Sequence, residues 1–117
     1  RLGEIHLIYA EACMHAGGDA SAQVKALSER AGVSAPAKID ADFLLAERSR
    51  ELMWEGHRRS DLIRFGQFTT DAYLWEYKGA VYEGTAVADY RNLFPLPPAD
   101  VNANGNLDQN PGYASAK

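Results

Sequence analysis

The sequence has little cysteine, no long apolar run and no excess of positive charge. It has one cysteine, Cys13, in 117 residues, so no internal disulfide can form. No apolar run approaches the roughly 20 residues that a membrane-spanning helix needs. Lysine and arginine number 12 against 16 acidic residues, giving a formal net charge of −4. This balance argues against a nucleic-acid partner and against electrostatic docking on anionic lipid.

The common catalytic and cofactor motifs are also missing. There is no G-x-S-x-G nucleophile motif and no glycine-rich phosphate loop. Glu51 and Glu55 have the residue type of a glycosidase pair, but they follow one helical stripe among arginines that hold both carboxylates ionised. His57 and Asp61 lie four residues apart, yet two ligands are too few for a metal site. We therefore expect no enzyme activity, no cofactor and no metal.

Apolar residues recur at helical spacing at the start of the chain. The spacing predicts an amphipathic helix over residues 2–16, which Gly17 and Gly18 end. Asp19 is a suitable N-cap for a second helix over about 20–31. The residues expected to face the core are Leu2, Ile5, Ile8, Tyr9, Ala12, Cys13 and Ala16, then Val24, Leu27 and Ala31. The two helices together predict an αα-hairpin.

Two further helices are expected to meet at a sharp corner. Asp40 is a suitable N-cap for a third helix that runs to Gly56, a residue type that favours the left-handed end of a helix. Trp54, near its end, is expected to lie in the core. Asp61 stands near the start of a short fourth helix, where its charge suits the helix dipole. Gly66 ends this fourth helix.

Residues 47–66 carry an unusual density of charge. Glu47, Glu51 and Glu55 recur four residues apart, and like charges at that spacing repel by roughly 0.2–0.5 kcal/mol per pair. One interpretation is a buried brace at the corner, in which Arg58→Ala or Glu51→Ala costs about 3–5 kcal/mol. The other is a set of solvated pairs worth roughly 0–1 kcal/mol each. This charge network comprises Glu47, Arg48, Arg50, Glu51, Glu55, Arg58, Asp61 and Arg64.

Aromatic residues gather between residues 67 and 92. Tyr73, Trp75 and Tyr77 alternate, as on one face of a strand or within a helical turn, and a short strand is expected at 80–83. Trp and Tyr combine a rigid apolar face with a polar edge, which suits a sugar ring. The alternative is that these rings pack the segment onto the helices. The candidate ligand-binding residues are Tyr73, Trp75, Tyr77, Tyr82 and Tyr90.

Three blocks of the sequence resemble one protein family. Residues 47–66, ERSRELMWEGHRRSDLIRFG, resemble the C-terminal signature of the SusD/RagB family. Residues 1–12, RLGEIHLIYAEA, are similar to a helix that lies upstream of this signature. Residues 93–113, LFPLPPADVNANGNLDQNPGY, resemble the closing block of the family, and a helical turn is expected to begin there at Pro98. The blocks follow the order of the family, and only about residues 67–90 lie outside the resemblance.

The resemblance implies a mainly α fold, the C-terminal portion of a SusD/RagB-like domain. Residues 1–66 would form tetratricopeptide-like helical hairpins, and residues 67–117 a loop-rich segment and tail. Two departures affect local packing only. Arg59 and Ser60 stand where the family usually has an aromatic pair, and Gly105 stands where it usually has proline.

The resemblance also implies a function. The family consists of surface-exposed outer-membrane lipoproteins of Bacteroidetes, so the lipid anchor would lie at an N-terminus outside this chain. Such a protein captures an oligosaccharide or another nutrient and passes it to a SusC-like TonB-dependent transporter without cleaving it. The alternative is a tetratricopeptide-like protein-interaction module. That module would need further helical hairpins at a regular period, and residues 67–117 offer none.

Overall fold

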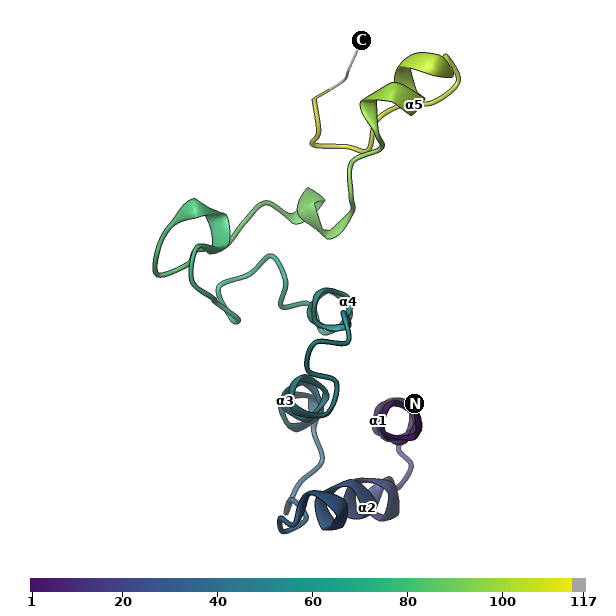
Figure 1. The fold of residues 1–117 in the computed structure, drawn as a ribbon, viewed down its shortest axis with the longest axis vertical. Helices are drawn as coiled ribbons and strands as arrows, with labels where there is room; N and C mark the ends of the chain where they lie inside the picture. The colour runs from purple at the N-terminus through teal and green to yellow at the C-terminus, as the bar shows by residue number, and fades with distance from the viewer. Residues whose placement is uncertain (115–117) are drawn as a thin grey trace. The chain divides into compact units, whose positions relative to one another are not determined.

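A computed structural model describes residues 1–114 of the protein. Its helices are α1 (Leu2–Ala16), α2 (Ser21–Ala31), α3 (Ala41–Glu51), α4 (Arg58–Arg64) and α5 (Pro98–Ala103), with 3₁₀ turns η1 (Lys78–Ala80) and η2 (Asp89–Asn92) (Figure 1). No strand occurs in residues 1–114, which confirms the mainly α fold. The chain divides into two compact units, a helical unit over Arg1–Phe65 and a loop unit that begins at Gly66.

A small apolar core holds the helical unit together. Helix α1 packs against both α2 and α3, and α4 packs against α3 (Figure 1). The core residues are Leu7, Ala10, Ala20, Val24, Leu27, Leu44 and Leu52. Because full burial of one aliphatic side chain of this size contributes about 1.5–3 kcal/mol, the core orders the hairpin of α1 and α2 against α3.

Helix α1 has the predicted bounds but turns a different face toward the core. Its buried residues are Gly3, Leu7, Ala10 and Glu11. Its exposed large apolar residues are Leu2, Ile5, Ile8 and Tyr9, and Ala12 and Ala16 are exposed as well, so the predicted core position of these six residues was wrong. The cause is the close passage of α3, because a Cβ added at Gly3 would collide with the carboxylate of Glu51. The absence of a side chain at Gly3 allows that approach, and Leu7 and Ala10 fill the core on the same face of the helix.

Aspartate side chains begin two of the helices. Asp40 accepts a hydrogen bond from the backbone N–H of Phe43 at 2.9 Å, which confirms it as the N-cap of α3. Asp19 accepts a bond from the backbone N–H of Ser21 at 2.9 Å. The N-cap residue of α2 is Ala20, however, so this helix begins one position later than predicted.

Helix α3 ends earlier than the sequence predicts. Its last residue is Glu51, and Leu52 is its C-cap, so the predicted end at Gly56 was wrong. The following turn includes Trp54 in the left-handed region, with φ of 66°. This backbone conformation directs the indole out of the helical unit, and Trp54 is 94% exposed. The prediction that Trp54 lies in the core was therefore also wrong.

Substituting Asp40 tests the cap of α3. We expect Asp40→Ala to lower the free energy of unfolding by about 1 kcal/mol, because the backbone N–H of Phe43 loses its partner. Asp40→Asn keeps a side-chain oxygen acceptor and should cost much less. Denaturant unfolding of the intact protein measures both changes. Equal losses in the two variants would show that the charge of Asp40, and not its cap bond, matters.

The loop unit contains only turns and one short helix in its described part, up to residue 114. The strand predicted at 80–83 and the strand-like alternation from Tyr73 to Tyr77 were both wrong. Tyr77 and Ala80 each have φ of 64°, which no extended strand accommodates. The helical turn predicted at Pro98 is confirmed as the start of α5, where the proline ring suits the first helical position.

Candidate functional site

The charge network has one fully buried ion pair at its centre. Nε of Arg48 on α3 donates to Oδ1 of Asp61 on α4 at 2.8 Å, and the side chains are 4% and 2% exposed. Nη2 of Arg64 donates to the same oxygen at 3.0 Å and to Oε2 of Glu11 on α1 at 2.9 Å. Hydrogen bonding to Glu11 raises the pKa of Arg64 above its usual value. The centre of the network thus ties α4 to both α3 and α1.

Glu51, the last residue of α3, and Glu55, which follows the helix, pair with arginines from other parts of the helical unit. Glu51 binds Nη1 of Arg1 at 2.7 Å and also binds Arg30 of α2, while Glu55 binds Nε of Arg1 at 2.5 Å. Burial acts to raise the pKa of Glu51, but hydrogen bonds and charges from Arg30 and Arg1 outweigh it and lower the pKa. Glu51 is therefore ionised at neutral pH, which does not suit a general acid.

The remaining network residues make local contacts. Arg50 and Glu47 form a surface pair within α3, with Nη2 and Oε2 2.6 Å apart. Nη1 of Arg58 donates to the backbone carbonyl of Leu45 at 2.7 Å. The network is therefore a helix brace that reaches α1 and α2, a wider arrangement than the interlocked corner that the sequence suggests.

The aromatic candidates lie mainly in a closed loop, residues 68–85, which we call the aromatic loop. Lys78 is at its centre and is only 2% exposed. Its Nζ donates to the carbonyl of Tyr73 at 2.7 Å and also to the carbonyl of Thr70. Burial lowers the pKa of Lys78, and the charge of Asp71 acts in the opposite direction. Nothing in the sequence singles out Lys78, because a lysine in a polar segment carries no sign of burial.

Trp75 is the aromatic support of this loop. Its ring stacks on Phe68 with centroids 5.8 Å apart and an interplanar angle of 29°. The ring of Tyr73 lies 6.3 Å from it, and Nζ of Lys78 lies 4.8 Å from its centroid. These contacts involve three neighbours, although Trp75 is still 40% exposed, less than Tyr77 and Tyr82.

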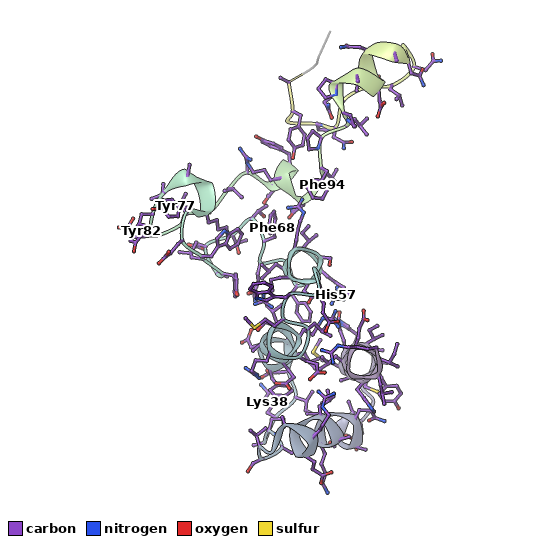
Figure 2. The ribbon with its side chains drawn as sticks, viewed as in Figure 1. Lys38, His57, Phe68, Tyr77, Tyr82 and Phe94 are labelled. Carbon is purple, nitrogen blue, oxygen red and sulfur yellow. The ribbon has the colours of Figure 1, made fainter. Side chains whose placement is uncertain are left out.

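Tyr77 and Tyr82 form an exposed pair on the same loop. Their rings meet edge to face, with centroids 5.5 Å apart and an interplanar angle of 80° (Figure 2). They are 67% and 57% exposed. The backbone N–H of Tyr77 donates to the carbonyl of Tyr82 at 3.1 Å, which holds the two residues together. Of the five aromatic candidates, these two present the most open surface.

Tyr90 lies apart from that pair and belongs to a different cluster. Its ring meets Tyr113 edge to face at 4.8 Å, and Arg91 lies 5.5 Å from its centroid. A Cβ added at Gly112 would overlap the Tyr90 ring, so the glycine packs directly on it. These contacts make Tyr90 an attachment point for the tail.

Side-chain amides fasten the tail to the extended segment before α5. Gln109 accepts a bond from the N–H of Leu96 and donates to its carbonyl, both at 2.8 Å. Nδ2 of Asn110 donates to the carbonyl of Phe94 at 2.7 Å, and the Tyr113 hydroxyl donates to that of Leu93 at 2.7 Å. We call this set of contacts the tail clasp. Its residue types are visible in the sequence, but their partners are not.

None of the helices within residues 1–114 is long and apolar enough to cross a membrane. The same residues contain no group of three or more His, Cys, Asp or Glu side chains that is placed to hold a metal ion.

Comparisons with known proteins agree on a single family. Residues 1–113 match the sequence profile of the SusD family. The chain is 46% identical over 114 residues to the starch-binding protein SusD of Bacteroides thetaiotaomicron, covering 97% of this chain and 21% of that protein. Its structure is similar to surface glycan-binding protein A from Bacteroides thetaiotaomicron, with a TM-score of 0.76 and 28% identity. That match covers 93% of this chain and 23% of the other, so the chain spans about a fifth of each relative.

Proposed function

Because this chain belongs to the SusD family, we propose that it is part of a glycan-capturing component of a Sus-type nutrient uptake system. The protein binds an oligosaccharide at the outer-membrane surface, where a lipid at its N-terminus anchors it. It passes the glycan to a SusC-like TonB-dependent transporter. Capture proceeds without bond cleavage, in keeping with the names of the two relatives, which describe binding proteins.

Within this chain, the exposed Tyr77–Tyr82 pair is the observation that supports a direct ligand contact. Two open rings at 80° to each other offer one face and one edge to a ligand. A sugar ring has apolar C–H faces that pack on an aromatic face and hydroxyls that bond to phenolic oxygens. We therefore assign the first glycan contact of this chain to Tyr77 and Tyr82, with Tyr73 and Trp75 as their support.

A hollow next to η1 offers room for part of a ligand. It has a volume of about 400 Å³. It is lined by Gly79, Ala80, Ala86, Val87, Ala88, Tyr90 and Arg91. Tyr77 and Tyr82 do not line it, so it is a separate place in the loop unit where a further sugar residue of the same glycan could bind.

The charge of the aromatic loop favours a neutral glycan. Asp71, Glu76 and Glu83 are exposed. Lys78 is the only cation in residues 68–85, and it is buried. On this loop a sulfated or uronic-acid glycan would meet like charge, and the cation of the hollow, Arg91, lies outside residues 68–85. We therefore choose an α-glucan as the first ligand, because a relative 46% identical to the chain is named a starch-binding protein.

Removing both rings tests the contact. We expect Tyr77→Ala with Tyr82→Ala, made in the intact protein, to weaken maltoheptaose binding about tenfold or more, since each stacked ring contributes about 0.5–1.5 kcal/mol. Isothermal titration calorimetry measures the affinity. The matched control, Tyr77→Phe with Tyr82→Phe, keeps both ring faces and should retain most of it.

The result separates the contact from the wider function. If the double-alanine variant binds with wild-type affinity, the tyrosine pair is not part of the binding site. The proposal that the protein captures glycan would remain. Absence of binding by the wild-type protein to α-glucans and to a panel of other neutral oligosaccharides would overturn glycan capture itself.

A further inference from the structure

Lys78 is the best-satisfied buried charge of the loop unit. Lysine is among the residues least often fully buried in proteins, yet this side chain is 2% exposed. Its ammonium donates to the carbonyls of Thr70 and Tyr73 and lies 4.8 Å from the Trp75 ring. Two carbonyls and one aromatic ring match the three N–H donors of an ammonium group. The side chain is therefore enclosed by the loop that carries it.

The backbone of Lys78 joins the same arrangement. Its N–H donates to the carbonyl of Trp75 at 3.1 Å, and its carbonyl accepts from the N–H of Thr85 at 3.0 Å. A Cβ added at Gly84 would collide with the Trp75 carbonyl, so the returning chain passes very close to the lysine turn. The main chain and side chain of Lys78 together connect both arms of the aromatic loop.

The residues next to Lys78 have a costly conformation. Tyr77, directly before it, has φ of 64°, and Ala80, two positions after it, has the same value. A non-glycine residue in this region costs roughly 1–2 kcal/mol and persists only where the surrounding structure requires it. At Tyr77, this conformation places the phenol ring against Tyr82 and in solvent.

We propose that Lys78 is a positioning residue that holds the aromatic loop in the conformation presenting Tyr77 and Tyr82 to a glycan. Its ammonium gathers the carbonyls of Thr70 and Tyr73 beneath the turn, which keeps Tyr77 in its left-handed conformation. Lys78 itself does not touch the ligand. The inference rests on the proposed function for the ligand, but the loop contacts can be tested without one.

Lys78→Met separates the effect of the N–H donors of Lys78 from the effect of its side-chain volume. Lys78→Met keeps an unbranched apolar stem and removes the N–H donors, so it should release the carbonyls of Thr70 and Tyr73. We expect hydrogen exchange across residues 74–85 to become about tenfold faster or more, with exchange in α1 to α4 unchanged. Maltoheptaose affinity should fall about tenfold, to the level of the double-alanine variant at Tyr77 and Tyr82.

Lys78→Arg is the charge-keeping variant. It keeps a cation with several N–H donors in a larger group, so its affinity should lie between that of Lys78→Met and that of wild type. Lys38→Met is the matched control, because this lysine of the helical unit is a solvated surface residue. It should change neither exchange nor affinity.

A combined variant shows whether Lys78 acts through the tyrosines. Adding Lys78→Met to the double-alanine variant should cause no further loss of affinity, since the rings it positions are already absent. A further loss would mean that Lys78 contacts the glycan by another route, and it would overturn the positioning role.

Measuring both hydrogen exchange and affinity separates a failure of the Lys78 inference from a failure of the proposed function. Unchanged exchange in the loop of Lys78→Met overturns the role of Lys78, whether or not the protein binds glycan. Faster exchange with unchanged affinity also overturns it, because the loop would then be irrelevant to binding. Failure of the wild-type protein to bind any neutral glycan overturns the proposed function, while the exchange result still decides whether Lys78 holds the loop.

Discussion

Asp61→Ala is expected to lower the free energy of unfolding of the helical unit by about 3–5 kcal/mol. The substitution leaves the guanidinium of Arg48 buried without its carboxylate, because the pair is almost fully excluded from solvent. It also removes one of the two carboxylates that bind Arg64. Denaturant unfolding of the intact protein, with hydrogen exchange of α3 and α4 as the local readout, measures the loss.

Two further variants test whether the burial of the Arg48–Asp61 pair makes its loss costly. Arg50→Ala breaks the surface pair with Glu47 and should cost no more than about 1 kcal/mol. Arg48→Met combined with Asp61→Leu replaces the buried pair by apolar groups of similar size and should recover most of the stability. A loss below about 1 kcal/mol for Asp61→Ala would show that the pair is not the centre of the brace.

Gly112→Val is expected to detach the tail clasp, at a cost of about 2–4 kcal/mol to the loop unit. Gly112 has φ of 88°, which a β-branched residue adopts only under strain. The new side chain would also overlap the Tyr90 ring. This ring also contacts Tyr113 and Arg91, which limit its room to move away. Limited proteolysis and hydrogen exchange over residues 104–113 should show the tail released.

Gly105→Ala is the matched control for this prediction. A Cβ added at Gly105 meets nothing within 4 Å, and its φ is outside the left-handed range. The alanine should leave stability within about 0.5 kcal/mol of wild type or raise it slightly by restricting the unfolded chain. An intact tail in Gly112→Val would show that the glycine is not required for the clasp.

Local signals in the sequence predicted the helices well. The bounds of α1 and the cap of α3 follow from apolar spacing, Gly17 and Asp40, which act through neighbouring residues. The start of α5 at Pro98 has the same origin. The family resemblance, carried by three motif blocks, agrees with the match of residues 1–113 to the SusD family.

The signals failed where a long-range contact decided the outcome. The alternation of Tyr73, Trp75 and Tyr77 resembles a strand, but the segment forms a turn with left-handed residues, in which the buried Lys78 donates to the Tyr73 carbonyl. The partners of Glu51 come from the chain start and from α2, because α1 packs against both α2 and α3, which places Arg1 and Arg30 near it. Neither partner is near Glu51 in the sequence.

By itself, the sequence determined which segments of this protein form helices and to which family it belongs, since caps, apolar spacing and motif order depend on neighbouring residues. Only the tertiary structure decided which face of α1 is buried, which arginine meets which carboxylate, and which aromatic rings remain open. Those outcomes depend on the approach of segments far apart in the chain, where a glycine, a buried charge or a backbone carbonyl sets the distance.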